Sequence, residues 1–87
     1  MAITSVASAA SSTALLSPEG SRKGLIVTNT DANTLYVLLD GGTASATNHS
    51  FQLAQNASSI IYGWTGAVVG LWAGDGSGVA LLTTWTA

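Results

Sequence analysis

Short apolar runs alternate with clusters of glycine, asparagine and aspartate along most of the chain. The runs are rich in β-branched and aromatic residues, and turn-forming residues bound each one, which is the pattern of β-strands. No segment carries the apolar stripe, with a period of about 3.6 residues, that indicates an amphipathic helix. The pattern predicts strands at residues 24–28, 34–39, 49–53, 58–62, 67–73 and 79–85.

Two of these runs also indicate how the strands are buried. Residues 49–53 alternate, with Phe51 and Leu53 on one face, as in a strand that turns one face to the core. Residues 67–73 are continuously apolar, as in a strand buried on both faces. Six or seven short strands with regularly spaced turns predict an all-β domain, a single small antiparallel β-sandwich or compact barrel.

Two connections carry the residues that favour β-hairpins. Residues 29–33 form a turn cluster between 24–28 and 34–39, and we expect these two strands to pair as a hairpin. Residues 74–78 contain Asp-Gly, a pair suited to positive φ, and predict a second hairpin that leads into residues 79–85. The same glycine-rich segment lacks the Lys-Ser/Thr pair of a phosphate-binding loop.

The segment before Pro18 differs from the rest in composition. It is built mostly of Ala, Ser and Thr, and Pro18 and Gly20 mark a turn at its end. Small residues bury little area, so residues 1–17 are predicted to be an extended N-terminal arm or an edge strand, with residues 18–87 as the sandwich or barrel domain. As an arm, the segment would add a strand to a neighbouring chain. Its apolar anchors would be Ile3, Val6, Leu15 and Leu16.

The scarcity of charge bears most directly on function. Charged residues make up 7% of the chain, against about 25% in an ordinary soluble domain. A surface patch of about 800 Å², the share of one partner in a standard interface, therefore carries about one charge and is easily desolvated. This favours a protein that assembles with other chains; a neutral soluble domain coated with Ser and Thr is the alternative. The charged residues are Glu19, Arg22, Lys23, Asp31, Asp40 and Asp75.

Charge and cysteine content also argue against several classes of partner. The net charge is −2, and the adjacent cations Arg22 and Lys23 cannot form a basic face, so we expect no binding to nucleic acid. The absence of cysteine fits folding in a reducing cytosol. The first 16 residues lack the basic start and continuous apolar run of a signal peptide, and no stretch is apolar enough to span a membrane.

The residues that could carry catalysis or hold a metal are few and scattered. His49 is the single histidine, and a triad with Ser50 and Asp40 lacks the sequence motifs of a nucleophile elbow. Asp31, Asp40 and Asp75 lie in three different turns, where aspartate usually bonds its own backbone. We therefore expect no enzyme activity, no metal site and no cofactor.

Four further side chains have an expected place. Trp72 lies in the most apolar run and is predicted to fill the core. Trp64 lies in a turn and Trp85 near the C-terminus, where each could stack on a sugar, anchor an interface or fill a core or rim position. Arg22, next to a turn, is expected to bind backbone carbonyls or an acidic partner.

Several short motifs lie in the part of the chain after Pro18. They are Arg22-Lys23-Gly24-Leu25, Val27, Asn29 and Leu35-Tyr36-Val37, followed by Tyr62, Thr65-Gly66, Val69, Leu71-Trp72-Ala73, Gly76 and Gly78. With these motifs the chain resembles small virion proteins of tailed bacteriophages. The resemblance implies a β-sandwich or small barrel on a phage particle that coats or cements the capsid, and it brings no catalytic residues.

From this resemblance and the low charge we expect a structural virion protein that decorates or cements a bacteriophage capsid by binding between neighbouring capsid subunits. Its partners would be the major capsid protein and other copies of itself, with a trimer favoured by analogy with decoration proteins. It would be made in the host bacterial cytoplasm and would reside on the capsid surface. The alternative is a carbohydrate-binding or fibre module that uses exposed tryptophans. The predicted interface residues are Ile3, Val6, Leu15, Leu16, Trp64 and Trp85.

Overall fold

The computed structural model describes residues 2–86, which form eight β-strands and no helix. Six of the strands lie where the apolar runs predicted them, and the segment before Pro18 contributes the other two. In chain order the strands are β1 (Ala2–Ala7), β2 (Thr13–Leu16), β3 (Gly24–Asn29), β4 (Leu35–Leu38), β5 (Phe51–Leu53), β6 (Ser58–Tyr62), β7 (Val68–Trp72) and β8 (Val79–Trp85).

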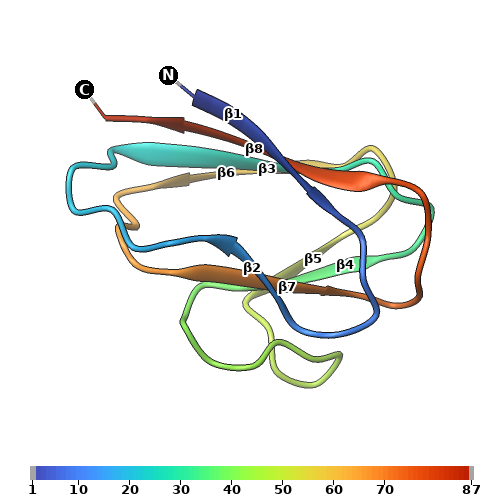
Figure 1. The fold of residues 1–87 in the computed structure, drawn as a ribbon. Coiled ribbons are helices and arrows are strands. Elements are labelled where there is room, and N and C mark those ends of the chain that lie inside the picture. The colour runs from blue at the N-terminus through green and yellow to red at the C-terminus, as the bar shows by residue number, and fades with distance from the viewer. Residues whose placement is uncertain (1, 87) are drawn as a thin grey trace.

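The strands form two four-stranded sheets that pack face to face, which confirms the predicted small antiparallel β-sandwich (Figure 1). The first sheet has the strand order β1-β8-β3-β6 and the second has the order β2-β7-β4-β5. Neighbouring strands in both sheets are antiparallel. The two sheets remain separate, so the architecture is a sandwich and not a barrel.

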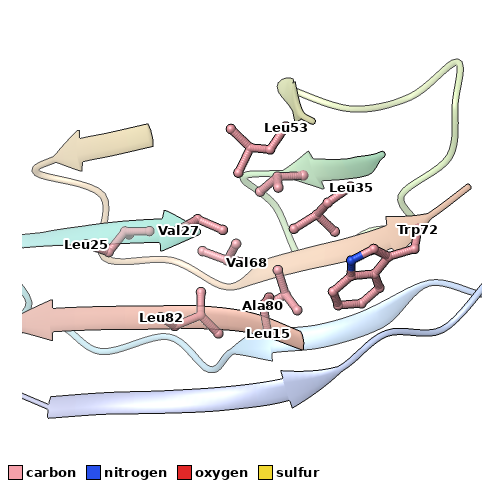
Figure 2. Packing of buried hydrophobic residues seen from close by; sticks show 10 residues of the cluster. Leu15, Leu25, Val27, Leu35, Leu53, Val68, Trp72, Ala80 and Leu82 are labelled. Carbon is pink, nitrogen blue, oxygen red and sulfur yellow. The ribbon is translucent and has the colours of Figure 1, made fainter. Parts of the chain in front are cut away.

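The core lies between the sheets and is built from the inward-facing side chains of both (Figure 2). Trp72 is fully buried there, as predicted, and is the largest of these side chains. Strand β7 is buried on both faces, again as predicted from its continuous apolar run. The buried cluster consists of Leu15, Leu25, Val27, Leu35, Val37, Leu53, Val68, Trp72, Ala80 and Leu82.

Almost every connection in the chain crosses from one sheet to the other. Within residues 2–86, only the connection from β4 to β5 joins two strands of the same sheet. Both predicted hairpins are therefore wrong: β3 pairs with β6 and β8 rather than with β4, and β8 pairs with β1 and β3 rather than with β7. Buried polar side chains in these connections explain why.

Asn29, at the end of β3, lies fully inside the protein and uses all of its side-chain hydrogen-bonding capacity there. Its amide nitrogen Nδ2 donates to the carbonyl oxygens of Asn33 and Leu53, at 2.9 and 3.0 Å. Its oxygen Oδ1 accepts from the backbone N–H of Asp31 and from the indole N–H of Trp72, both at 3.0 Å. Because this side chain is anchored in the core, the chain crosses to the opposite sheet and β4 does not fold back on β3.

The connection after β7 packs against Asp31 instead of closing a hairpin. The carboxylate of Asp31, which is 2% exposed, accepts hydrogen bonds from the backbone N–H groups of Asn33 and Gly78, each at 2.9 Å. A Cβ atom on Gly76 or Gly78 would overlap with Asp31. Neither glycine has a positive φ, so both serve the close approach of two connections rather than a tight turn.

Arg22 joins two connections at the opposite end of the sandwich. It is 3% exposed, and its guanidinium donates to the carbonyl oxygens of Ser17 at 2.6 Å, Gly66 at 3.0 Å and Trp64 at 3.4 Å. These acceptors belong to the β2–β3 and β6–β7 connections. The expectation that Arg22 binds backbone carbonyls is confirmed, and the contacts hold both connections over the end of the core.

The segment before Pro18 supplies an edge strand to each sheet of its own domain. Strand β1 pairs with β8 along its whole length, from Ala2 opposite Thr84 to Ala7 opposite Val79. Strand β2 pairs with β7, with an irregular register between Ala14 and Leu16. In the structure the segment therefore forms edge strands that pair within its own chain, which is the second of the two predicted alternatives. Met1, at its start, and Ala87, at the end of the chain, lie outside the described residues.

Replacing Asn29 tests the role of the buried amide. The variant Asn29→Ala leaves the indole N–H of Trp72 and the carbonyl of Leu53 without these partners inside the core. We expect its free energy of unfolding to fall by about 3 kcal/mol, measured by urea denaturation. In the control Asn48→Ala, the exposed side chain loses one bond to the carbonyl of Thr43, and the change should stay below about 1 kcal/mol. Equal losses in the two variants would contradict the assignment.

The carboxylate of Asp31 should make stability depend on pH. The backbone N–H groups of Asn33 and then Gly78 lower the pKa of Asp31 below its ordinary value of 3.8, despite the opposing effect of burial. The unfolded chain therefore binds more protons in this range, so stability is fully present above the ordinary pKa and is lost as the pH falls through the folded value.

We expect Asp31→Asn to lower the thermal midpoint at neutral pH and to flatten its decline below about pH 4. The measurement is thermal unfolding followed by circular dichroism across the acid range. Asp40→Asn is the control, since the exposed Asp40 carboxylate bonds only its neighbour Gly41. Parallel acid profiles for Asp31→Asn and the unmodified chain would contradict the prediction.

Candidate interaction surface

The outer face of the first sheet presents an uncharged surface made of rows that cross the four strands. The strand register places Ile3, Thr83, Ile26 and Ile60 in one row. The next row is Ser5, Leu81, Thr28 and Ser58, in which the hydroxyls of Thr28 and Ser58 are 2.7 Å apart. We call this surface the open face; its residues are Ile3, Ser5, Gly24, Ile26, Thr28, Ser58, Ile60, Tyr62, Leu81, Thr83 and Trp85.

The large hydrophobic side chains that are exposed within residues 2–86 all lie on the open face. Ile3 is 66% exposed, Ile60 53%, Tyr62 74% and Leu81 36%. The open face contains no Asp, Glu, Lys or Arg. Because these exposed apolar side chains gather on one face and are not scattered, the open face is the candidate interaction surface.

Trp85 and Tyr62 form an aromatic end to the open face. They lie on either side of Gly24 in a third row, and their ring centroids are 6.1 Å apart at an interplanar angle of 72°. A Cβ atom on Gly24 would overlap with the indole of Trp85. Gly24 thus lets the indole lie against the sheet, so the three strands present a continuous aromatic and apolar edge.

The second sheet differs because the chain covers the middle of its outer face, while Ala14 and Gln52 on its edge strands stay exposed. The connection between β4 and β5, residues 39–50, passes beneath this sheet in Figure 1. Ala44 of this connection is fully buried, and its N–H donates to the hydroxyl of Ser12 at 3.0 Å, beyond β4 and β7. The ring of His49 lies 4.9 Å from that of Tyr36. The middle of one outer face is therefore covered from within the chain, and the open face is not.

The groups weighed for catalysis and metal binding serve turns and connections. The His49 ring nitrogen Nδ1 lies 3.0 Å from the carbonyl oxygen of Ser45, and the hydroxyl of Ser50 accepts from the N–H of Leu39. Residues 2–86 contain no pocket and no group of three or more His, Cys, Asp or Glu side chains placed to hold a metal ion. The described chain has no helix long and apolar enough to cross a membrane.

The aspartates bond backbone N–H groups, although one of them differs from expectation. Asp31 and Asp40 accept from the N–H groups of Asn33 and Gly41, as predicted for turn aspartates. Asp75 instead accepts from the N–H of Ala10, at 2.9 Å, and so ties the β1–β2 connection to the β7–β8 connection.

The predicted interface residues of the N-terminal segment fall in different environments. Ile3 lies on the open face, whereas Val6 points inward and is half-buried against the core. Leu15 belongs to the core cluster and Leu16 packs half-buried beside it. The structure brings only Ile3 of these four residues to the open face.

The two tryptophans outside the core are both half-buried and do not pair with each other. The indole N–H of Trp64 donates to the carbonyl of Ala67 at 3.0 Å, and its ring lies so close to Gly66 that a Cβ there would overlap. Trp85 lies on the open face and pairs with Tyr62. The structure therefore places Trp85 in the candidate surface and Trp64 in the packing of the β6–β7 connection.

Sequence reasoning missed Ile26, Ile60, Tyr62 and Leu81 as surface residues. A usable signal was present in the adjacent apolar pairs Ile60-Ile61 and Leu81-Leu82. Successive side chains of a strand point to opposite faces, so one member of each pair must leave the core of a two-layer sandwich. The sequence does not say which member does so, because that depends on strand pairing.

Comparisons of the chain with protein-family models, with curated proteins and with solved structures each found no match. The fold itself defines the class: a small antiparallel β-sandwich with one open apolar face.

Removing residues 2–16 separates an arm from a structural segment. The deletion removes an edge strand from each sheet and takes Leu15 out of the core. Loss of one buried leucine side chain alone costs about 2–5 kcal/mol, a large part of the stability of a domain of this size. We therefore expect the shortened chain to show no cooperative thermal unfolding.

Two full-length variants serve as controls for the deletion. Leu15→Ala should melt cooperatively at a lower temperature, and Ile3→Ala should melt close to the unmodified chain because Ile3 is exposed. A shortened chain that still melts cooperatively would show that residues 2–16 act as a detachable arm.

Proposed function

We propose that the chain is a structural virion protein that decorates or cements a bacteriophage capsid by binding between neighbouring capsid subunits. The observation that carries the proposal is the open face, which gathers Ile3, Ile60, Tyr62 and Leu81 on one charge-free sheet surface. A surface of this kind serves association with another protein.

The energetics of the open face suit attachment to a repeating shell. Burying its apolar side chains contributes about 25 cal/mol per Å² and requires no charge to be desolvated. Four strands spaced about 4.8 Å apart make a face about 19 Å wide, so a single contact is small. A capsid repeats its contacts by symmetry, and linked copies gain avidity from many weak contacts.

The resemblance to small virion proteins of tailed bacteriophages supplies the biological setting of the proposal. Several of its motif residues hold the fold together: Arg22 joins two connections, Asn29 and Trp72 bond in the core, and Gly78 packs against Asp31. The resemblance therefore supports a shared scaffold, while the open face supports the mode of action. The major capsid protein is the proposed partner, together with other copies of this chain.

A carbohydrate-binding module is the weaker alternative. A sugar platform needs aromatic rings that share one exposed surface. Trp64 is held in the β6–β7 connection by its bond to Ala67, and the ring beside Trp85 is Tyr62. Trp64 is therefore not free to act as a platform. Trp85 is half-buried and meets Tyr62 at an interplanar angle of 72°, so these two rings do not form a flat surface on which a sugar could stack.

The test uses particles of the phage that encodes the chain. Mass spectrometry should detect the chain in purified virions, and cryo-electron microscopy should place it between capsid subunits with the open face toward the shell. Particles lacking the chain should bind it when it is added back. Absence of the chain from purified particles would contradict the proposal.

A charge placed in the middle of the open face provides the matched variant. Leu81→Lys should weaken binding to particles at least about tenfold, because the new ammonium group must be desolvated in the contact. Ala46→Lys adds the same charge at an exposed position of the 39–50 connection and should bind as the unmodified chain does. Equal binding by both variants would show that attachment uses another surface.

A further inference from the structure

The edge strands of the two sheets differ in length and in the regularity of their register. In the second sheet, edge strand β2 has an irregular register between Ala14 and Leu16, and edge strand β5 has three residues. In the first sheet, edge strands β1 and β6 have six and five residues in regular register, without charge or proline. Proteins usually protect long edges with charge, proline, bulges or short strands, because an open edge pairs with further strands.

The polarity of the first sheet makes its two edges complementary to each other. Strands β1 and β8, β8 and β3, and β3 and β6 are antiparallel, so β1 and β6 run in opposite directions. A second copy placed beside the first in the same orientation would therefore present its β6 antiparallel to β1. The joined strands would continue the antiparallel sheet from one copy to the next.

The side-chain rows also match across this junction. Ile3 and Ile60 are the two ends of one row, and Ser5 and Ser58 are the two ends of the next. Continuing the rows places Ile3 opposite Ile60 of the next copy, and Ser5 opposite its Ser58. Pairing β1 with β1 of a second copy along most of the strand would instead set Ile3 opposite Ser5 or Ala7, and a register with Ile3 opposite Ile3 would pair only the start of the strand. Apolar cross-strand pairs stabilise a sheet, so the first arrangement is favoured over β1–β1 pairing. Pairing β6 with β6 would also set Ile60 opposite Ile60, but it would leave both β1 edges open.

We propose that the first sheet extends from copy to copy by pairing β1 of one chain with β6 of the next. Such a contact is heterologous, because it joins different surfaces of identical chains, and it produces a closed ring or an open chain of copies. The proposal deepens the self-association contained in the proposed function, but it requires no capsid. The open face stays available for a shell, since edge pairing uses the sides of the sheet.

The first test is sedimentation velocity on the whole chain in solution. The unmodified chain should associate at about 100 micromolar, well above the Kd of a micromolar contact. Ile3→Lys and Ile60→Lys should each weaken association about tenfold, because a lysine on an edge strand opposes pairing. Both side chains are more than half exposed, so thermal unfolding should remain close to that of the unmodified chain. Ala46→Lys is the charge-matched control and should associate normally.

A charge exchange tests the register. In a chain carrying Ile3→Lys together with Ile60→Glu, each junction places opposite charges directly across the strands, which stabilises the pair. Association should return to within about threefold of the unmodified chain. A monomeric unmodified chain, or lysine variants that associate normally, would overturn edge pairing. If the lysine variants do not associate and the charge exchange does not restore association, the β1–β6 register is overturned.

Cysteine cross-linking gives an independent reading, because the chain contains no cysteine. Mixing an Ile3→Cys chain with an Ile60→Cys chain under oxidising conditions should yield mainly the mixed dimer. Dimers formed by Ile3→Cys alone, or by Ile60→Cys alone, would indicate pairing of identical edges, β1–β1 or β6–β6, and would overturn the proposal. Leu81→Lys separates this inference from capsid binding: it should retain association in solution even where its binding to particles is lost.

Discussion

The buried hydrogen bonds of Asn29 are the constraint on which the rest of the structure depends. A sandwich in which nearly every connection crosses between sheets has many loops over the ends of its core. The Asn29 side chain bonds Trp72 at the end of β7, Leu53 at the end of β5 and Asn33 in the β3–β4 connection. One side chain thus positions three connections that cross between the sheets. At the other end, Arg22 joins two of these connections by donating to three carbonyl oxygens. The core of ten buried apolar residues is non-directional, whereas these hydrogen bonds join specific connections.

The crossing topology also produces the asymmetry between the two outer faces. Among the connections of residues 2–86, only residues 39–50 join two strands of one sheet, and this connection folds beneath that sheet, where it buries Ala44 and packs His49 on Tyr36. No connection within residues 2–86 covers the first sheet in the same way. Its outward apolar side chains and its regular edges therefore remain available to other chains, and face and edge can serve different contacts.

The proposed mode of action follows from where charge is absent. The chain has six charged residues, and none of them lies on the open face. The buried Arg22 and Asp31 form hydrogen bonds with backbone groups. The described chain thus presents an apolar surface without an electrostatic pattern to select a partner. In the proposed assembly, specificity would come from shape, strand register and repetition.

Strand positions and the all-β class could be predicted because apolar runs and turn residues are local signals, and six strands lie where those signals placed them. The same local reasoning gave wrong hairpins at residues 29–33 and 74–78. Asp-Gly and Asn-rich clusters favour tight turns, but here the polar side chains bond partners far along the chain, such as Asp31 with Gly78. A local pattern of turn residues contains no information about hydrogen bonds to residues far along the chain.

The sequence by itself determined six of the short strands, the burial of Trp72 and a surface with little charge. Only the tertiary structure decided which side of each strand is buried and therefore which residues face outward. Ile60 and Ile61, or Leu81 and Leu82, are equivalent as sequence. Strand pairing breaks that equivalence, because a shift of one residue in register exchanges the two faces of a strand. The open face exists because the pairing of β1, β8, β3 and β6 aligns one member of each pair on the same side.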